Sequence, residues 1–279
     1  MPLRRFAAAV FLMVSLAPSS HAATRPVWVG DTRQQVEARL QAAHRQPIGQ
    51  ALVELARGML GRPYTAFSLD TAANEQLRLN LMSFDCLLLV EQLLALIHSP
   101  TVHDFPEQVA SLRYQHGKPD YCERNHYFSL WAQQAEQNGF LKNLSPTLPG
   151  ASGRNRSLTF MSQHPNSYRP MRQAQLRRCI RDKERNLVVR QTFVPISALS
   201  SASKGLQSGD IFALVTSVPN LDVTHTGILE RTASGLQAIH AAPGKGVVRS
   251  GDFVGYASRV QDVVGVSFYR PLAPRAQNP

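Results

Sequence analysis

The stretch over residues 81–97 constrains the fold of this chain most. Its apolar residues recur at helical spacing, at Leu87, Leu88, Val90, Leu93, Leu94 and Ile97. This pattern predicts a largely buried helix over about residues 85–98, with Cys86 in its first turn and Ser83 or Asp85 as its cap. The free amide hydrogens and the positive dipole end at a helix start favour an anion, so a thiol there is biased towards thiolate. The alternative is that Cys86 is a small buried core residue.

The first 22 residues have the parts of a secretion signal. Arg4 and Arg5 precede an apolar run over residues 6–17, and small residues follow up to a cleavage point after Ala22. The run is too short to span a bilayer, and no later segment is apolar for long enough. We therefore expect a secreted, periplasmic protein that does not insert stably into the membrane, with residues 23–279 forming one domain.

The chain is strongly basic, with 30 Lys and Arg against 19 Asp and Glu. Outside the cytoplasm such a charge fits cell-wall polymer, phospholipid headgroups or lipopolysaccharide, or serves only solubility. A nucleic-acid binder fits the charge but not the secretion signal, and no motif of alternating aromatic and basic residues supports it. We therefore expect no nucleic-acid partner.

Three cysteines leave at least one thiol unpaired. A bridge between Cys122 and Cys179 would leave Cys86 as the free thiol, but the sequence alone leaves the pairing open. Cys122 and His126 could share a helix face, yet no second pair at zinc-finger spacing accompanies them. A metal site is therefore not expected there.

The predicted helices come first in the chain and the strands later. Residues 24–44 and 48–60 have helical patterns, and residues 100–203 look mainly helical with irregular connections. From residue 206 the pattern becomes extended, which predicts strands over residues 209–216, 221–230, 235–241, 247–249 and 263–270. Helices followed by strands, without alternation, indicate an α+β fold in which the Cys86 helix packs on a small antiparallel sheet.

Two histidines, His225 and His240, lie on consecutive predicted strands. If these strands form a hairpin centred near residues 232 and 233, the two side chains lie opposite one another on one face of the sheet. A register shift of one residue would separate them, whereas a shift of two would keep them together as diagonal neighbours. A cysteine nucleophile needs a base, and two histidines on one face of the sheet could supply it.

These residue types suit attack on an amide carbonyl by a thiolate. We assign Cys86 as nucleophile, His225 as base and acid, and His240 as the residue that orients His225. The Cys86 backbone amide and the Tyr64 hydroxyl would stabilise the oxyanion. Asp222 is a rival for the third role, although its place in a predicted loop favours turn formation or substrate contact. A zinc hydrolase built on His225, His240 and Asp222 is a further alternative.

Several short motifs in this order resemble the NlpC-type cell-wall cysteine peptidases, a papain-like superfamily. They are Gly61-Arg62-Pro63-Tyr64, Phe84-Asp85-Cys86, Gly209-Asp210-Ile211, Asp222-Val223-Thr224-His225-Thr226-Gly227 and Ile239-His240-Ala241. A second set resembles one branch of that superfamily, the N-acetylmuramoyl-L-alanine amidase-like proteins, long catalogued as a domain of unknown function. It comprises Arg113-Tyr114, His126-Tyr127-Phe128, Trp131, Phe160-Met161-Ser162 and His164-Pro165.

The resemblance implies a papain-like fold and a Cys-His-His triad. It also implies cleavage between the muramic acid lactyl group and L-alanine in small 1,6-anhydro muropeptides. A helical insertion over about residues 101–199 would wall a closed pocket, and Asp85, His126, Tyr127 and Met161 are expected beside the substrate. Asn125 stands where the pattern has an arginine. No cofactor is expected, and we expect a monomer.

Two alternatives remain open at this point. An endopeptidase that cuts between D-glutamate and the diamino acid of the stem peptide would use the same triad. A catalytically inactive wall-binding module would use only the basic surface, and the presence of all three triad residues argues against it.

Overall fold

The computed structural model of this chain describes residues 25–274. The predicted secretion signal over residues 1–22 lies outside these residues, and the expectation of one domain stays a prediction. Within the described residues, no helix is both long and apolar enough to cross a membrane.

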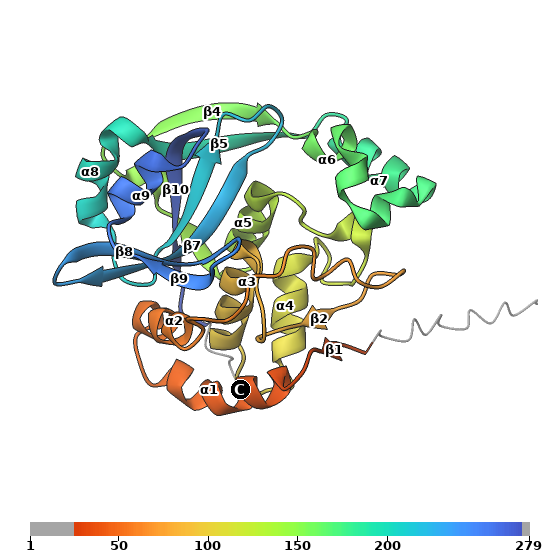
Figure 1. Cartoon of the computed structure of the whole chain (residues 1–279), viewed down its shortest axis with the longest axis horizontal. Coiled ribbons are helices and arrows are strands. Elements are labelled where there is room, and N and C mark those ends of the chain that lie inside the picture. Colours follow the sequence, from red (N-terminus) through yellow and green to blue (C-terminus); the bar gives the residue numbers. More distant parts are fainter. Residues whose placement is uncertain (1–24, 275–279) are drawn as a thin grey trace, which may run out of the picture.

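Five helices from the first half of the chain gather on one side of the sheet (Figure 1). They are α1 (Thr32–His44), α2 (Ile48–Arg57), α3 (Cys86–Ile97), α4 (Phe105–Arg113) and α5 (Phe128–Gln137). A small parallel pair, β1 (Val27–Trp28) and β2 (Arg78–Leu79), lies beside them. Helix α3 is central, because it contacts α1, α2, α4 and the sheet.

The main sheet has eight strands, and every pairing in it is antiparallel. Its order is β4-β5-β10-β6-β7-β8-β9, and β3 also pairs with β10. The strands are β3 (Leu141–Asn143), β4 (Ser152–Ser157), β5 (Val188–Pro195), β6 (Ile211–Thr216), β7 (Val223–Thr232), β8 (Gly235–Ala242), β9 (Gly246–Ser250) and β10 (Val263–Pro271). The α+β architecture predicted from the sequence is confirmed.

The sheet separates two hydrophobic cores, and β6 shows the division residue by residue. Ile211 and Ala213 belong to the core under α1–α5, whereas Phe212 and Leu214 belong to the core under α8 (Leu199–Ala202) and α9 (Phe253–Arg259). Because successive side chains of a strand point to opposite faces, one strand contributes to both cores.

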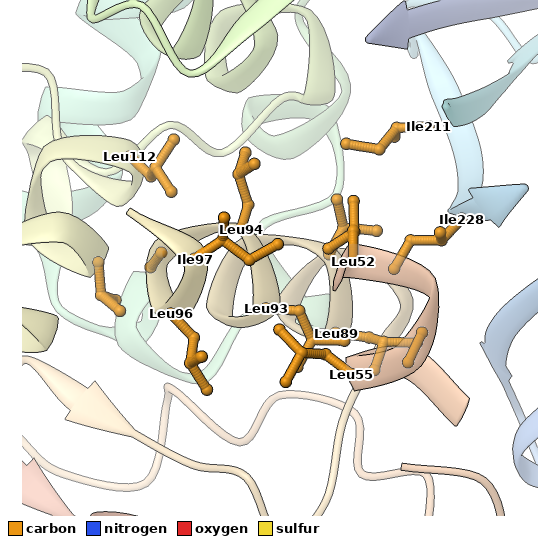
Figure 2. Packing of buried hydrophobic residues seen from close by; sticks show 14 of the residues in the cluster. Leu52, Leu55, Leu89, Leu93, Leu94, Leu96, Ile97, Leu112, Ile211 and Ile228 are labelled. Atoms are coloured by element: carbon orange, nitrogen blue, oxygen red, sulfur yellow. The ribbon is translucent and has the colours of Figure 1, made fainter. Parts of the chain in front are cut away.

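Helix α3 is buried from Leu88 to Ile97, as its apolar pattern predicted. Figure 2 shows its leucines near Leu52 and Leu55 of α2, with Ile228 of β7 in the same cluster. This packing holds the first turn of α3, and hence Cys86, beside the sheet.

The predicted insertion over residues 101–199 is mainly helical, as its sequence suggested, but it also contains strands that the sequence did not indicate. It contains α4, α5, α6 (Phe160–Gln163), α7 (Ala174–Glu184) and short 3₁₀ turns such as η1 (Tyr121–Glu123), but also β3, β4 and β5, which extend the main sheet. Strand β4 has the sequence SGRNRS and lies at the sheet edge. Without apolar residues it gives no period-2 hydrophobic signal, so the sequence did not indicate this strand.

Candidate active site

Cys86 is the first residue of α3, and Asp85 caps the helix in front of it. The Asp85 carboxylate accepts a hydrogen bond from the Leu88 backbone N–H at 2.8 Å. The Cys86 side chain is partly buried, and its thiol is free because Cys122 and Cys179 form a disulfide. The sequence left this pairing open, and the structure shows the one that spares Cys86.

The Cys86 thiol is not a ready thiolate. Burial raises its pKa to about 12, and the Asp85 charge adds to the rise. The backbone amides of Thr226, Leu87 and Cys86 itself act on the thiol in the opposite direction, but burial outweighs them. The expectation of a thiolate from the helix dipole alone was therefore wrong, and a base must take the proton as the sulfur reacts.

His225 on β7 and His240 on β8 form a hydrogen-bonded pair. Nε2 of His225 lies 2.7 Å from Nδ1 of His240. In the hairpin Thr232 pairs with Gly235, so the register is shifted by two residues from the one assumed. The two histidines are consequently diagonal neighbours on one face of the sheet rather than directly opposite one another.

Ser250 and Gly227 complete the immediate surroundings of His240. The second ring nitrogen of His240, Nε2, lies 2.8 Å from Ser250 Oγ at the end of β9. A β-carbon at Gly227 would approach the His240 Cβ to 2.7 Å. The missing side chain at position 227 therefore gives the His240 ring its room, and polar contacts run from Ser250 through His240 to His225.

Both histidines are held neutral by their surroundings. Burial lowers the pKa of His225 to about 3, and the neighbouring His240 contributes. Burial lowers the pKa of His240 to about 4, with a further contribution from Lys245. The Tyr256 ring of α9 packs 4.9 Å from the His240 ring and 6.5 Å from the His225 ring. A neutral imidazole can accept a proton from a thiol.

Helix α3, whose first residue is Cys86, packs against β7, the strand that carries His225. The Thr226 backbone amide, next to His225, lies near enough to the Cys86 thiol to act on its pKa. Thr224, on the other side of His225, lines the same pocket as Cys86. Because His240 occupies Nε2 of His225, Nδ1 is the nitrogen left to accept a proton.

Backbone hydrogen bonds hold Tyr64 beside the segment that precedes α3. It forms a parallel β-bridge with Phe84, in which Phe84 N–H donates to Pro63 O at 3.1 Å and Thr65 N–H donates to Phe84 O at 2.9 Å. Burial raises the pKa of Tyr64 to about 12, with Cys86 and Asp85 adding to it. The phenol is thus a neutral hydrogen-bond donor near Cys86, as its predicted role requires.

Cys86 opens into a cavity of about 410 Å³. The wall combines the loop over residues 64–70, the first turns of α3 and part of the insertion. Its lining includes Tyr64, Asp85, Cys86, Tyr121, His126, Met161 and Tyr168. The insertion therefore contributes to the pocket, as expected.

His126 and Met161 lie on the pocket wall, whereas Tyr127 does not. The His126 ring nitrogen Nε2 lies 2.7 Å from Tyr121 O, and burial lowers the pKa of this histidine to about 3. The Tyr127 hydroxyl donates to Glu184 at 2.5 Å and accepts from the Met161 N–H at 3.1 Å. The Tyr127 hydroxyl therefore holds α6 to α7, and its predicted contact with substrate stays a prediction.

Asp222 is also outside the pocket. Its buried carboxylate accepts from the Ser129 N–H at 2.7 Å and from the Val223 N–H at 2.9 Å. It shapes its own turn and caps the start of α5, which agrees with the turn-forming role considered from the sequence, whereas its contact with substrate stays a prediction. The zinc alternative needs this carboxylate beside the histidines. Among the described residues, no group of three metal-ligating side chains is arranged to hold an ion.

The sequence analysis did not single out three residues near the pocket or the histidine pair: Arg124, Ser250 and Tyr256. Arg124 lines the pocket one residue before Asn125, and it donates to Asp70 at 2.8 Å and to Glu75 at 3.1 Å. Its guanidinium lies 4.9 Å from the centre of the Tyr121 ring. Ser250 and Tyr256 have no local pattern that marks them. A search for arginine on either side of Asn125 would have found Arg124.

The chain matches a family model described as N-acetylmuramoyl-L-alanine amidase-like, AmiA-like, over residues 54–264. No curated protein matches it. Among solved structures, an N-acetylmuramoyl-L-alanine amidase from Bacteroides uniformis is 28% identical, with a TM-score of 0.74, over 80% of this chain and 98% of that one. A proposed xylanase from Bacteroides fragilis is 28% identical, with a TM-score of 0.72, over 78% and 99%.

A Legionella pneumophila protein assigned to the family DUF1460 is 18% identical to this chain. Its TM-score is 0.72, over 87% of this chain and 95% of that one. At this identity the likeness concerns the fold alone.

Proposed function

Because this chain belongs to the N-acetylmuramoyl-L-alanine amidase-like family, we propose that it is an exported cysteine amidase of the NlpC-type, papain-like superfamily. It hydrolyses the amide bond between the muramic acid lactyl group and L-alanine in small peptidoglycan fragments. The observation that carries the proposal is the hydrogen-bonded pair His225–His240, on two strands that pack against α3, the helix that begins with Cys86. This arrangement supplies a nucleophile, a base and an orienting group.

In the first half of the reaction the Cys86 sulfur attacks the lactyl carbonyl carbon. The thiol proton passes to Nδ1 of His225 as the carbon–sulfur bond forms, and the carbonyl electron pair moves to oxygen. The His225 imidazolium then protonates the L-alanine nitrogen. The carbon–nitrogen bond breaks, the peptide leaves with a free amine, and a thioester on Cys86 remains.

In the second half, His225 takes a proton from a water molecule that attacks the thioester. The carbon–sulfur bond breaks, the muramic acid carboxyl group is released, and the proton returns to the Cys86 sulfur. The full cycle begins and ends with a neutral thiol and a neutral imidazole, and between the two halves Cys86 carries the thioester while His225 is neutral. The pKa values of Cys86, raised to about 12, and of His225, lowered to about 3, support this starting state.

Two donors would stabilise the oxyanion in both halves. The Cys86 backbone N–H stands in the first turn of α3, where no carbonyl of the helix accepts from it. The Tyr64 hydroxyl is neutral and lines the same cavity. Removal of one such donor costs about 10²–10³ in kcat in comparable enzymes.

The charges in the cavity support an uncharged sugar within it. Arg113 is paired with Glu91, and Arg124 with Asp70 and Glu75, so both lining guanidiniums are neutralised. Among the described residues, the buried Tyr121 hydroxyl has no hydrogen-bond partner. Such a group is costly to bury unless a ligand or water satisfies it. These features fit a muramyl group, including its 1,6-anhydro form, better than an acidic peptide.

The proposal includes the cellular compartment, which is the periplasm. Disulfides persist in oxidising compartments, so the Cys122–Cys179 bridge supports export to the periplasm. We propose a monomer that acts on soluble muropeptides without nucleic acid, membrane insertion or a cofactor.

Mass spectrometry of an anhydro-disaccharide tetrapeptide, incubated with the mature protein and with Cys86→Ala, tests the function. We expect free tetrapeptide from the parent protein and none from the variant. Iodoacetamide should abolish the activity, and a metal chelator should leave it unchanged.

Other products would change the assignment. Release of a dipeptide would identify an endopeptidase, and binding without any cleavage would identify a wall-binding module. Equal turnover by Cys86→Ala would show that Cys86 is not the nucleophile.

A further inference from the structure

We propose that Ser250 is a positioning residue that accepts a hydrogen bond from His240 and thereby keeps His225 in the form that can take the Cys86 proton. The inference rests on the proposed roles of Cys86 and His225. It starts from the two short contacts of His240, 2.7 Å to His225 and 2.8 Å to Ser250.

The protonated state of His225 fixes the direction of both hydrogen bonds. Once His225 has taken the thiol proton, both of its nitrogens carry hydrogen, so its Nε2 must donate to Nδ1 of His240. The neutral His240 ring then carries its own hydrogen on Nε2. The Ser250 oxygen lies 2.8 Å from that nitrogen and accepts its hydrogen, so one hydrogen bond runs from His225 to His240 and a second from His240 to Ser250.

The opposite arrangement would inactivate the base. If His240 carried its hydrogen on Nδ1, it would donate to Nε2 of His225, and the neutral His225 would carry its hydrogen on Nδ1. That nitrogen could no longer accept a proton from Cys86. Either direction satisfies the hydrogen bond between the two histidines. The contact of Ser250 with the other ring nitrogen of His240, Nε2, therefore helps to determine which direction is adopted.

The surroundings of His240 make this acceptor important. The side chain is only 3% exposed, so a Nε2 hydrogen without an acceptor would be a buried unsatisfied donor. The other groups facing the ring are His225 from β7, Tyr256 from α9 and Lys245 from the β8–β9 turn, and the lysine charge opposes a growing positive charge there. Ser250 is itself partly exposed, so its own hydrogen can point to solvent while its oxygen accepts.

The test compares Ser250→Thr, which keeps a hydroxyl oxygen, with Ser250→Val, which has the same shape without it. Both β-branched residues suit the end of a strand. Two readouts need no peptidoglycan: the rate of Cys86 alkylation by iodoacetamide across pH, and the ¹⁵N resonances that report which nitrogen of each histidine carries hydrogen. Ser258→Ala is the control, because its exposed hydroxyl bonds only to Val254 O within α9.

We expect Ser250→Val to slow alkylation at neutral pH by about 10- to 100-fold, since a buried donor loses its acceptor. We also expect a hydrogen on Nδ1 of His225 in that variant. Ser250→Thr and Ser258→Ala should react like the parent.

Equal alkylation rates in the Thr and Val variants, or hydrogen remaining on Nε2 of both histidines in the Val variant, would overturn the proposal. If the Val variant behaves as expected but the parent cuts no muropeptide, the role of Ser250 stands and the proposed substrate fails. The two ideas can therefore fail separately.

Discussion

Burial sets the protonation state of the groups around Cys86. It raises the pKa of the thiol to about 12, lowers that of His225 to about 3, and raises that of the Asp85 carboxyl to about 6. Charged forms lose solvation in the interior, so each group shifts towards its neutral form. At the residue scale, Cys86 and His225 are therefore an uncharged thiol and an uncharged imidazole at neutral pH.

The spacing of the two histidines depends on a residue that has no side chain. A β-carbon at Gly227 would meet the His240 Cβ, the Ile239 carbonyl oxygen and the Phe212 ring, each at 2.7 Å. Three contacts of this kind, one of them with backbone, cannot be relieved by a single rotamer change.

Gly227→Ala should displace His240 and reduce the alkylation rate of Cys86 by at least about tenfold. The free energy of unfolding should also fall by about 1–3 kcal/mol, the usual cost of overpacking a core. Urea unfolding and iodoacetamide kinetics measure the two effects. Gly251→Ala is the control, because nothing lies within 4 Å of the added carbon, and it should match the parent. A fully reactive Gly227→Ala variant would contradict this account.

Among the elements, α5 depends on a cap from a distant part of the chain. Its own capping residue, Tyr127, makes no side-chain cap, and the Asp222 carboxylate serves the Ser129 N–H instead. This contact ties the start of β7, which carries His225, to the insertion. Asp222 thus links two elements that the pocket needs.

Asp222→Ala should lower the free energy of unfolding by about 2–3 kcal/mol, because a cap is lost and buried N–H groups lose their acceptor. At low temperature, where the variant remains folded, its Cys86 alkylation rate should equal that of the parent. Asp104→Ala is the control, since that carboxylate also accepts from a backbone N–H but is exposed, and its loss should cost under about 1 kcal/mol. An unchanged stability combined with slow alkylation would instead place Asp222 in the triad.

Over the whole molecule, buried neutral histidines link stability to pH. Burial lowers the pKa of His98 to about 4 and of His126 to about 3, in addition to the shifts of His225 and His240. An unfolded histidine titrates near pH 6.5. As the pH falls below that value, the unfolded chain binds protons that the folded chain does not, so stability is lost towards pH 3–4. Burial raises the pKa of the Asp85 and Asp222 carboxyls, and these two groups oppose the trend set by the four histidines.

We expect the free energy of unfolding to fall by several kcal/mol between pH 7.5 and about pH 4.5, with on the order of 1–2 kcal/mol from each buried histidine. His98→Gln, far from the active site and packed on Phe140, should show a smaller fall than the parent. Urea unfolding at the two pH values measures it. The exposed His103→Gln variant should fall as the parent does, and an equal fall in His98→Gln would count against the explanation.

The sequence by itself determined the elements that carry the triad. Hydrophobic periodicity within short segments predicts α3 from its apolar spacing, and β7 and β8 from their extended pattern. The order of Cys86, His225 and His240 is read directly from the chain. The same patterns led to the α+β architecture and to the family. A two-residue difference in hairpin register did not matter, because a shift by two keeps side chains on the same face.

Only the tertiary structure decided the rest. Asp222 caps a helix 93 residues away in sequence, Ser250 reaches His240 from the next strand, and β4 joins the sheet without any apolar residue. Such contacts join segments that are distant in sequence, so no local hydrophobic pattern predicts them. The neutral state of Cys86 and His225 also arises only on folding, because desolvation depends on every element that packs around a group, whereas the helix dipole can be inferred from one helix alone.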